Sequence, residues 1–189
     1  ILIEFSSTAT AVFGVYFKLQ SFFFMPVFGL NNGITPIIAY NYGARQRKRM
    51  TKTIKLSLFV AFCLTFIGFV LFESIPQVLL GMFSASDDLL KIGIPALRTI
   101  GVHYLIAWYC IIVGTVFQAL GKAIFSMVVS IMRQLVVLIP AAYLLAKFGG
   151  LHMVWWSFPI AEIMSFIVST AFLIRIWRTV IKDIPEGRE

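Results

Sequence analysis

Long apolar segments are the feature that most constrains this chain. Five of them can be separated, at about residues 10–42, 53–72, 92–119, 123–146 and 151–174. A helix needs about 20 apolar residues to cross a bilayer, so each segment is long enough for one crossing. Only 13% of the residues are charged, about half the share typical of a soluble domain. We therefore predict an all-α, polytopic helical membrane protein, and exclude a soluble domain, a disordered chain, a coiled coil and an outer-membrane barrel.

Turn and loop signals set the limits of these segments. The first segment exceeds one crossing, contains Pro26 and Pro36, and is expected to end at a C-cap glycine, Gly43. Pro76 ends the second segment and opens a polar loop, in which a short interfacial helix is expected at 77–83. Gly121 and the Gly149-Gly150 pair mark the two tight turns that follow. The expected architecture is thus five crossings joined by short connections.

The basic residues are distributed unevenly over the loops. The net charge of +8 would suggest a nucleic-acid partner in a soluble protein; here it indicates cytoplasmic loops. Of the sixteen Lys and Arg, eleven fall on one side of the five crossings. They lie in the run Arg45–Lys55, at Lys122 and in the tail: Arg175, Arg178, Lys182 and Arg188. Only Lys91 and Lys147 lie on the other side. We predict a multi-pass protein of the inner or plasma membrane, with the run 45–55 and the C-terminus cytoplasmic.

The basic run itself has two interpretations. It can act as a determinant of topology, or it can bind anionic lipid head groups, with about 1 kcal/mol per basic residue near the surface. The first interpretation is favoured at this stage. The bilayer is the expected partner, and nucleic acid is not.

Signatures of an enzyme or of a metal site are missing from the sequence. Cys63 and Cys110 lie inside apolar segments without CxxC spacing, and His103 and His152 lack HxxxH spacing. Both histidines are expected to be packed or interfacial. No nucleophile set, phosphate loop or pair of catalytic carboxylates is present. The sequence predicts no catalytic residue, no metal ligand and no cofactor.

Polar residues within the first segment share one helix face. At about 100° per residue, Gln20, Asn31 and Thr35 fall within about 60° of one another. Such a stripe can line a cavity for water or substrate, or it can supply hydrogen bonds between packed helices. The two interpretations remain open. Gly29 and Gly33 form a GxxxG pattern, which is expected to allow close helix packing.

One acidic residue lies deep within a crossing. Glu162 is about 16 Å from the outer turn at 1.5 Å per residue, and Arg133 has a similar depth from the inner turn. The fourth and fifth segments form a hairpin around Gly149, and the positions of the two residues match across it. We predict an intramembrane ion pair. It either locks two helices together, or it presents a carboxylate that changes partner during transport. Trp155, Trp156 and Trp177 lie near segment ends, where interfacial anchoring is typical.

Several motifs resemble one family of transporters. They are VYFKLQSF (15–22), MPVFGL (25–30), PIIAYNYGA (36–44), QALGK (118–122), RQ (133–134), IP (139–140) and SFPIAE (157–162). In this order and at these spacings the chain resembles the eighth to twelfth spans of the multidrug and toxic compound extrusion (MATE) family. The chain also opens at Ile1 inside an apolar stretch. We expect residues 1–5 to be the end of the preceding span.

The resemblance implies an architecture and a function. MATE proteins have two six-helix lobes and export cationic and amphipathic compounds in exchange for protons or sodium, by rocking between two states. Residues 1–189 would be the C-terminal lobe with five of its six helices, and the N-terminal lobe would be missing. The pathway residues would be Gln20, Asn31, Thr35, Arg133 and Glu162. Acidic residues that some members carry in the tenth span have no counterpart in 92–119, which leaves Glu162 as a substitute.

Other functions stay open. A flippase for lipids or lipid-linked oligosaccharides belongs to the same superfamily, but its cavity would carry several basic residues, and few basic residues lie within the segments here. A membrane subunit that does not transport would not need a polar face on a helix with internal prolines. A membrane enzyme is the least favoured, since no catalytic set is present.

Overall fold

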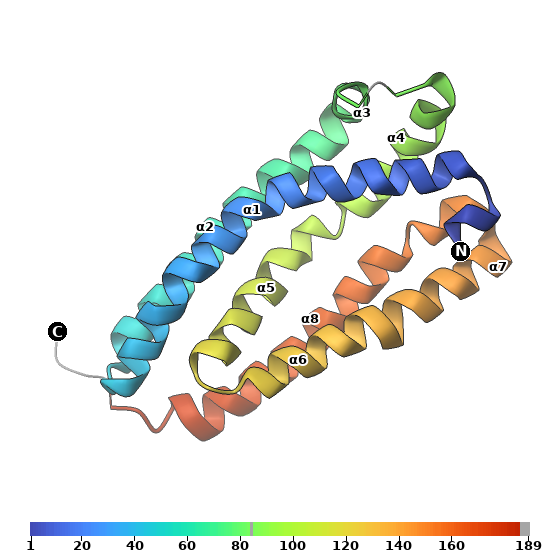
Figure 1. The fold of residues 1–189 in the computed structure, drawn as a ribbon. Helices are drawn as coiled ribbons and strands as arrows, with labels where there is room; N and C mark the ends of the chain where they lie inside the picture. The colour runs from blue at the N-terminus through green and yellow to red at the C-terminus, as the bar shows by residue number, and fades with distance from the viewer. Residues whose placement is uncertain (84, 186–189) are drawn as a thin grey trace.

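The computed structural model describes residues 1–83 and 85–185, and every regular element in this part is helical (Figure 1). Arg188, which belongs to the basic tail, lies outside the described residues. The elements are η1 (Leu2–Glu4), α1 (Ser7–Gly43), α2 (Arg47–Ser74), α3 (Pro76–Gly81), α4 (Asp87–Gly101), α5 (Tyr104–Ala119), α6 (Ala123–Ile131), the π-helical η2 (Met132–Leu138), α7 (Ile139–Val154), α8 (Ser157–Ile176) and the π-helical η3 (Trp177–Ile181).

Within residues 1–83 and 85–185, four helices are long and apolar enough to cross a membrane by themselves. They are α1, α2, the run Ala123–Val154, and α8 with η3. A fifth crossing is possible if α4 and α5, which meet at an angle of 50°, are counted as one broken span. The all-α membrane fold predicted from the sequence is therefore confirmed.

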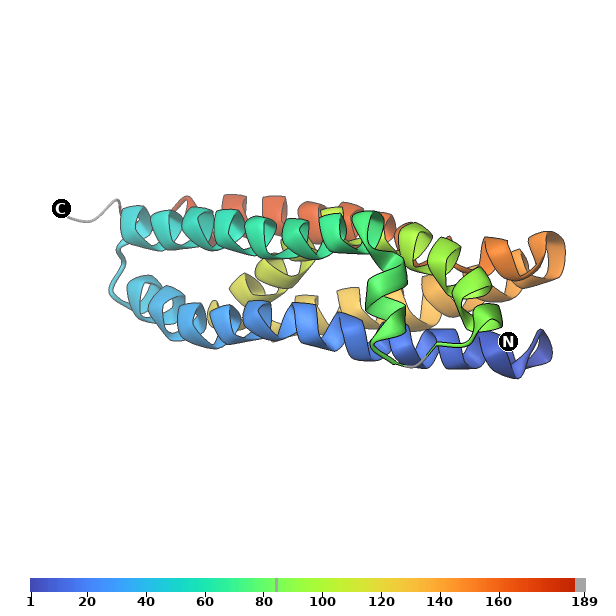
Figure 2. The ribbon, with the colours of Figure 1, turned by 90° about the horizontal axis from the view of Figure 1, so that it is seen from above.

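The connections gather at two opposite ends of an elongated bundle. The α1–α2 turn, the α5–α6 turn and the end of the described C-terminal segment share one end, and the loops around α3 and between α7 and α8 share the other (Figure 1). A backbone hydrogen bond of 3.2 Å from Arg47 to Pro185 ties the two basic segments together at the first end. Helix α5 lies between α1 and α2 on one side and α6 and α8 on the other (Figure 1), and seen from above it slants between the row of α2 and α8 and the row of α1 and α6 (Figure 2).

The first helix is longer than a bilayer is thick. Its 37 residues span about 55 Å at 1.5 Å per residue. Ser6 caps its N-terminus, with Oγ accepting from the Ala9 amide at 3.0 Å, and the helix bends partway along its length (Figure 1), as an internal proline such as Pro26 causes. The expected C-cap at Gly43 is wrong. Gly43 is the last helical residue, and the left-handed residue of the turn is Arg45, with φ of 53°.

The expected third crossing, 92–119, is two helices. Helix α4 starts earlier, at Asp87, because Ser86 accepts a hydrogen bond from the Leu89 amide and two aspartates lie in the first turn. The chain then breaks between Gly101 and Tyr104. At Gly101 α4 crosses α2 so closely that an added Cβ would lie 3.3 Å from Cβ of Phe72. The sequence did not predict this bend, because residues 92–119 are apolar on both sides of it.

The last hairpin also differs from the expected ranges. The 123–146 segment stays helical up to a turn at Gly150, where φ is 67°, and a short helical stretch then reaches Val154. Within it, η2 precedes Pro140. Proline lacks an N–H and crowds the carbonyl four residues before it, and the wider π-helical turn accommodates both effects. The 151–174 segment begins as α8 only at Ser157 and extends through η3 to Ile181.

Two apolar cores hold α1, α2, α4 and α5 together, while the run 123–154 packs loosely. None of the most apolar window of that run is buried. Trp155 is 1% exposed within one core, so the expected interfacial position is wrong for it, whereas Trp156 and Trp177 are exposed. Gly29 and Gly33 do not mediate close packing within the described chain, since an added Cβ at either would meet nothing within 4 Å.

Candidate functional site

Three adjoining cavities lie between α1 and α5 on one side and η2 and α8 on the other. Their volumes are about 360, 230 and 230 Å³, and Arg133 lines all three. We call them together the central groove. The largest cavity is bordered by exposed Asn32, Gln118 and Ser130, so the groove is open on one side of the bundle.

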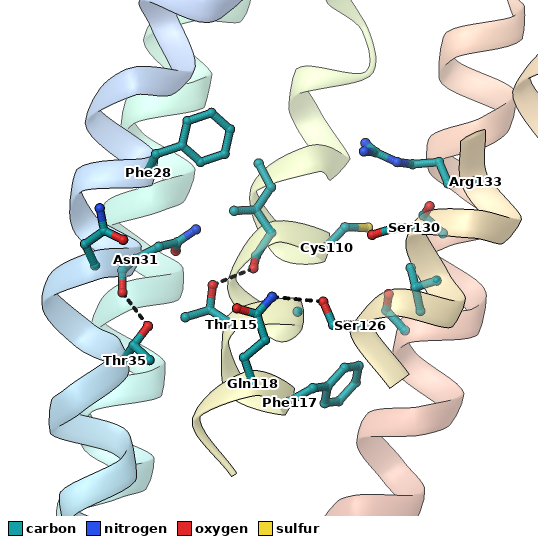
Figure 3. A pocket seen from close by; sticks show the side chains of 16 residues that line it. Phe28, Asn31, Thr35, Cys110, Thr115, Phe117, Gln118, Ser126, Ser130 and Arg133 are labelled. Carbon is teal, nitrogen blue, oxygen red and sulfur yellow. Dashed lines mark hydrogen bonds between the residues drawn. The ribbon is translucent and has the colours of Figure 1, made fainter. Parts of the chain in front are cut away.

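The polar face of α1 lies along this groove. Gln20 lines the two smaller cavities, and Asn31 and Thr35 line the largest one (Figure 3). Oγ1 of Thr35 donates to the Asn31 carbonyl at 2.6 Å, and the Asn31 side-chain oxygen is buried without a hydrogen-bond partner in the described chain. Of the two interpretations left open, the cavity-lining one fits Asn31 and Thr35, whereas Gln20 also makes a hydrogen bond to His103, between α4 and α5. No hydrogen bond from Asn31 or Thr35 to another helix is present among the described residues.

Arg133 and Glu162 meet as the hairpin positions predicted. Nη1 of Arg133 lies 3.3 Å from Oε2 of Glu162. The arginine side chain is 39% exposed and points from η2 into the groove (Figure 3). The glutamate side chain on α8 is 3% exposed. Because the carboxylate is buried with Arg133 as its charged partner, removal of one member of the pair is expected to lower the stability of the fold.

The other oxygen of Glu162 is left without a partner. Oε1 of Glu162 and the hydroxyl of Tyr16 are both buried and lack a hydrogen bond in the described chain. The thiol of Cys110 lies near the carboxylate, but a thiol is only a weak donor. Glu162 and Tyr16 line the same cavity of about 230 Å³. Buried polar atoms without partners are rare, and the cavity beside these two atoms has room for water or a small ion.

His103 sits in the break between α4 and α5 and contacts α1. Its Nδ1 lies 2.6 Å from the Ile100 carbonyl, and its Nε2 lies 3.3 Å from Nε2 of Gln20. In the neutral ring, Nδ1–H donates to the carbonyl, and Nε2 then accepts from the Gln20 amide. The histidine is packed, as expected, and the structure adds that it contacts the Ile100 carbonyl at the bend and the side chain of Gln20, a predicted pathway residue.

Sequence reasoning missed much of the groove's polar lining. Further polar side chains come from α5, α6 and α8: Thr115, Gln118, Ser126, Ser130, Ser165 and Ser169 (Figure 3). Gln118 donates to Ser126 at 3.1 Å across the α5–α6 turn. The spacings of Ser126 to Ser130, and of Glu162 to Ser165 and Ser169, are helical and were visible in the sequence. The contribution of α5 was not, because it depends on the bend at His103.

The groove can hold a ligand that is partly polar and partly apolar. Aromatic side chains such as Phe17, Phe24 and Phe28 line it beside hydroxyls and amides, and a single ion pair supplies its charge. Among residues 1–83 and 85–185, no three His, Cys, Asp or Glu side chains come together as a metal site would require.

Sequence comparisons with known proteins point to one family of multidrug transporters. A sequence profile of the family MatE matches residues 1–144. The multidrug export protein MepA of Staphylococcus haemolyticus is 30% identical over 172 residues, which cover 85% of this chain and 35% of MepA. The probable multidrug resistance protein YoeA of Bacillus subtilis is 23% identical over 177 residues, or 93% of this chain and 38% of YoeA.

A solved structure gives the same fold. The MATE multidrug transporter DinF-BH, determined as a complex with a bound compound, superposes with a TM-score of 0.81 at 33% identity, covering 90% of this chain and 38% of that chain. This chain thus spans little more than a third of the length of each of these relatives.

Proposed function

The chain belongs to the MatE family, and on that premise we propose that it is the C-terminal lobe of a transporter that exports cationic or amphipathic compounds in exchange for protons or sodium. The groove supports this role, because it is open on one side and has a mixed polar and aromatic lining. A second lobe of the same protein would cover the open side. Alternating access would then expose the groove to each side of the membrane in turn.

One observation carries the ion-coupling part of the proposal. Glu162 is buried on the groove wall, with one oxygen on Arg133 and the other without a partner in the described chain. When Glu162 is ionised, the pair is neutral overall. When it binds a proton or sodium, the charge of Arg133 is no longer balanced, and at short range in a low-dielectric site it repels a cationic ligand. Ion and cationic substrate would therefore exclude each other, as antiport requires.

The transport test uses the full-length protein that contains residues 1–189, reconstituted in vesicles. Uptake of a cationic dye is measured under an imposed proton gradient and, separately, under a sodium gradient. We expect flux with one gradient and loss of coupling in Glu162→Gln. Absence of flux with both gradients in folded protein would contradict the proposal.

A flippase for lipids or lipid-linked oligosaccharides is the second candidate, and one observation favours it. Arg133 lines all three cavities and is partly exposed. An arginine that binds a phosphate would have the same access to the groove. Arg133→Gln separates the two functions. It would abolish movement of an anionic lipid, whereas binding of a cationic dye would persist or strengthen.

The proposed orientation of the protein has the basic run 45–55 and the C-terminus in the cytoplasm.

A further inference from the structure

A second hollow lies at the end of the bundle where the two basic segments meet. Its volume is about 630 Å³. It is lined by Arg47, Lys48, Thr51, Lys52, Lys55, Trp177 and Lys182. We call this hollow the basic pocket.

The fold builds this pocket from two distant segments. Lys48, Lys52 and Lys55 are spaced by three or four positions and so share one face of α2. Trp177 and Lys182 come from the end of the chain. That end is held in place, since Nη1 of Arg47 donates to the Lys182 carbonyl at 2.8 Å and Ile181 and Ile184 pack with Met50 in the core.

We propose that the basic pocket binds the phosphate of an anionic phospholipid from the surrounding bilayer. Cations that converge on one hollow recognise a phosphate group, and basic pockets between helix ends are typical sites for lipid head groups. A determinant of topology needs positive charge on one side of the membrane, but it does not need lysines from two distant segments, Lys52 and Lys55 on α2 and Lys182 near the end of the chain, around one cavity.

The surface next to the pocket favours a lipid over a free phosphate ion. On the same face of α2, Lys52 is followed by Leu56 and Phe59, which are 61% and 65% exposed. Acyl chains can lie along these two side chains while the head group occupies the pocket. Trp177, which is partly exposed at the pocket wall, is a side chain typical of the membrane–water interface.

The test measures lipid binding to the detergent-solubilised full-length protein that contains residues 1–189, by native mass spectrometry. Short-chain phosphatidylglycerol, short-chain phosphatidylcholine and inorganic phosphate are the three probes. The pocket variant carries Lys52→Gln, Lys55→Gln and Lys182→Gln. The control variant carries Arg45→Gln, Arg49→Gln and Lys122→Gln, which remove the same charge from the same end but line no part of the pocket.

We expect phosphatidylglycerol to bind and phosphatidylcholine not to. Each lysine near an anionic lipid contributes about 1 kcal/mol, so the pocket variant should bind roughly 100-fold more weakly, while the control variant changes by a few-fold at most. Equal weakening in both variants would overturn the proposal, because binding would then depend on charge alone. Displacement of the lipid by millimolar inorganic phosphate, with no contribution from the acyl chains, would overturn the lipid as the occupant.

A second variant guards against misfolding or altered membrane insertion of the charge variants. Thr51→Trp keeps every cation and fills the pocket from its α2 wall. Loss of phosphatidylglycerol binding with an unchanged unfolding midpoint would support the pocket. Retained binding in Thr51→Trp would overturn it.

Discussion

Glu162 is the residue on which the account of the groove depends most. It is nearly inaccessible, whereas its partner Arg133 is partly exposed, so the two members of the pair are not equivalent. Without Arg133 the carboxylate stays buried and unpaired. Without the carboxylate, the guanidinium keeps access to the groove.

This asymmetry predicts the outcome of a double-mutant cycle. Arg133→Gln should destabilise the protein by roughly 3–5 kcal/mol, because it leaves a buried charge without a partner. Glu162→Gln should cost clearly less, and the double variant should also cost less than Arg133→Gln alone. The measurement is the free energy of unfolding in detergent. Additive effects of the two single changes would show that the residues do not interact.

A glycine in α2 provides a second prediction. An added Cβ at Gly68 would lie 3.1 Å from Cε1 of Tyr104, a ring buried in the core. Gly68→Ala should therefore cost about 1–3 kcal/mol through overpacking. Gly29→Ala is the matched control, since nothing lies within 4 Å of its Cβ position. Equal unfolding midpoints for the two variants would contradict the close crossing of α2 and α5.

The sequence predicted the residues of the site better than their surroundings. The helical period placed Gln20, Asn31 and Thr35 on one face, and hairpin positions placed Arg133 opposite Glu162. Both arguments depend only on local geometry. That Oε1 of Glu162 and the hydroxyl of Tyr16 are buried together beside a cavity depends on how several helices pack. No spacing in the sequence reports such packing.

At the scale of elements, one bend and one π-helical segment decide how the groove is lined. The break between α4 and α5 sets the direction of α5, and the π-helical η2 before Pro140 carries Arg133. Hydropathy predicted each region as one crossing, because an apolar run looks the same whether or not its helix is regular. Pro140 gave a signal for η2, while the bend between α4 and α5 depends on Gly101 and His103.

His103, at the bend between α4 and α5, is the basis of a prediction about how these two helices are held. His103→Leu removes the contacts to the Ile100 carbonyl and to Gln20, and buried polar groups left without partners cost about 1–3 kcal/mol. We expect the unfolding midpoint of the purified protein to fall accordingly. His152→Leu, at an exposed position in the last hairpin, should leave it nearly unchanged. The same result for both histidines would argue against a role of His103 in holding the bend.

At the scale of the whole molecule, we propose that the groove is half of a cavity. Its open side and the coverage of little more than a third of each relative both fit a lobe that works with another one. Residues 1–189 alone, reconstituted in vesicles, should therefore give no gradient-driven dye flux. Robust antiport by this chain alone would contradict the two-lobe account.

The central claim is that an ion and a cationic substrate compete through Glu162, and equilibrium binding tests it most directly. A fluorescent cationic dye is titrated into the full-length protein that contains residues 1–189 at several proton and sodium concentrations, for the unsubstituted protein and for Glu162→Gln. The account predicts that one of the two ions weakens dye binding to the unsubstituted protein and that Glu162→Gln abolishes this competition. Competition that persists unchanged in Glu162→Gln, or dye binding that neither ion affects, would contradict it.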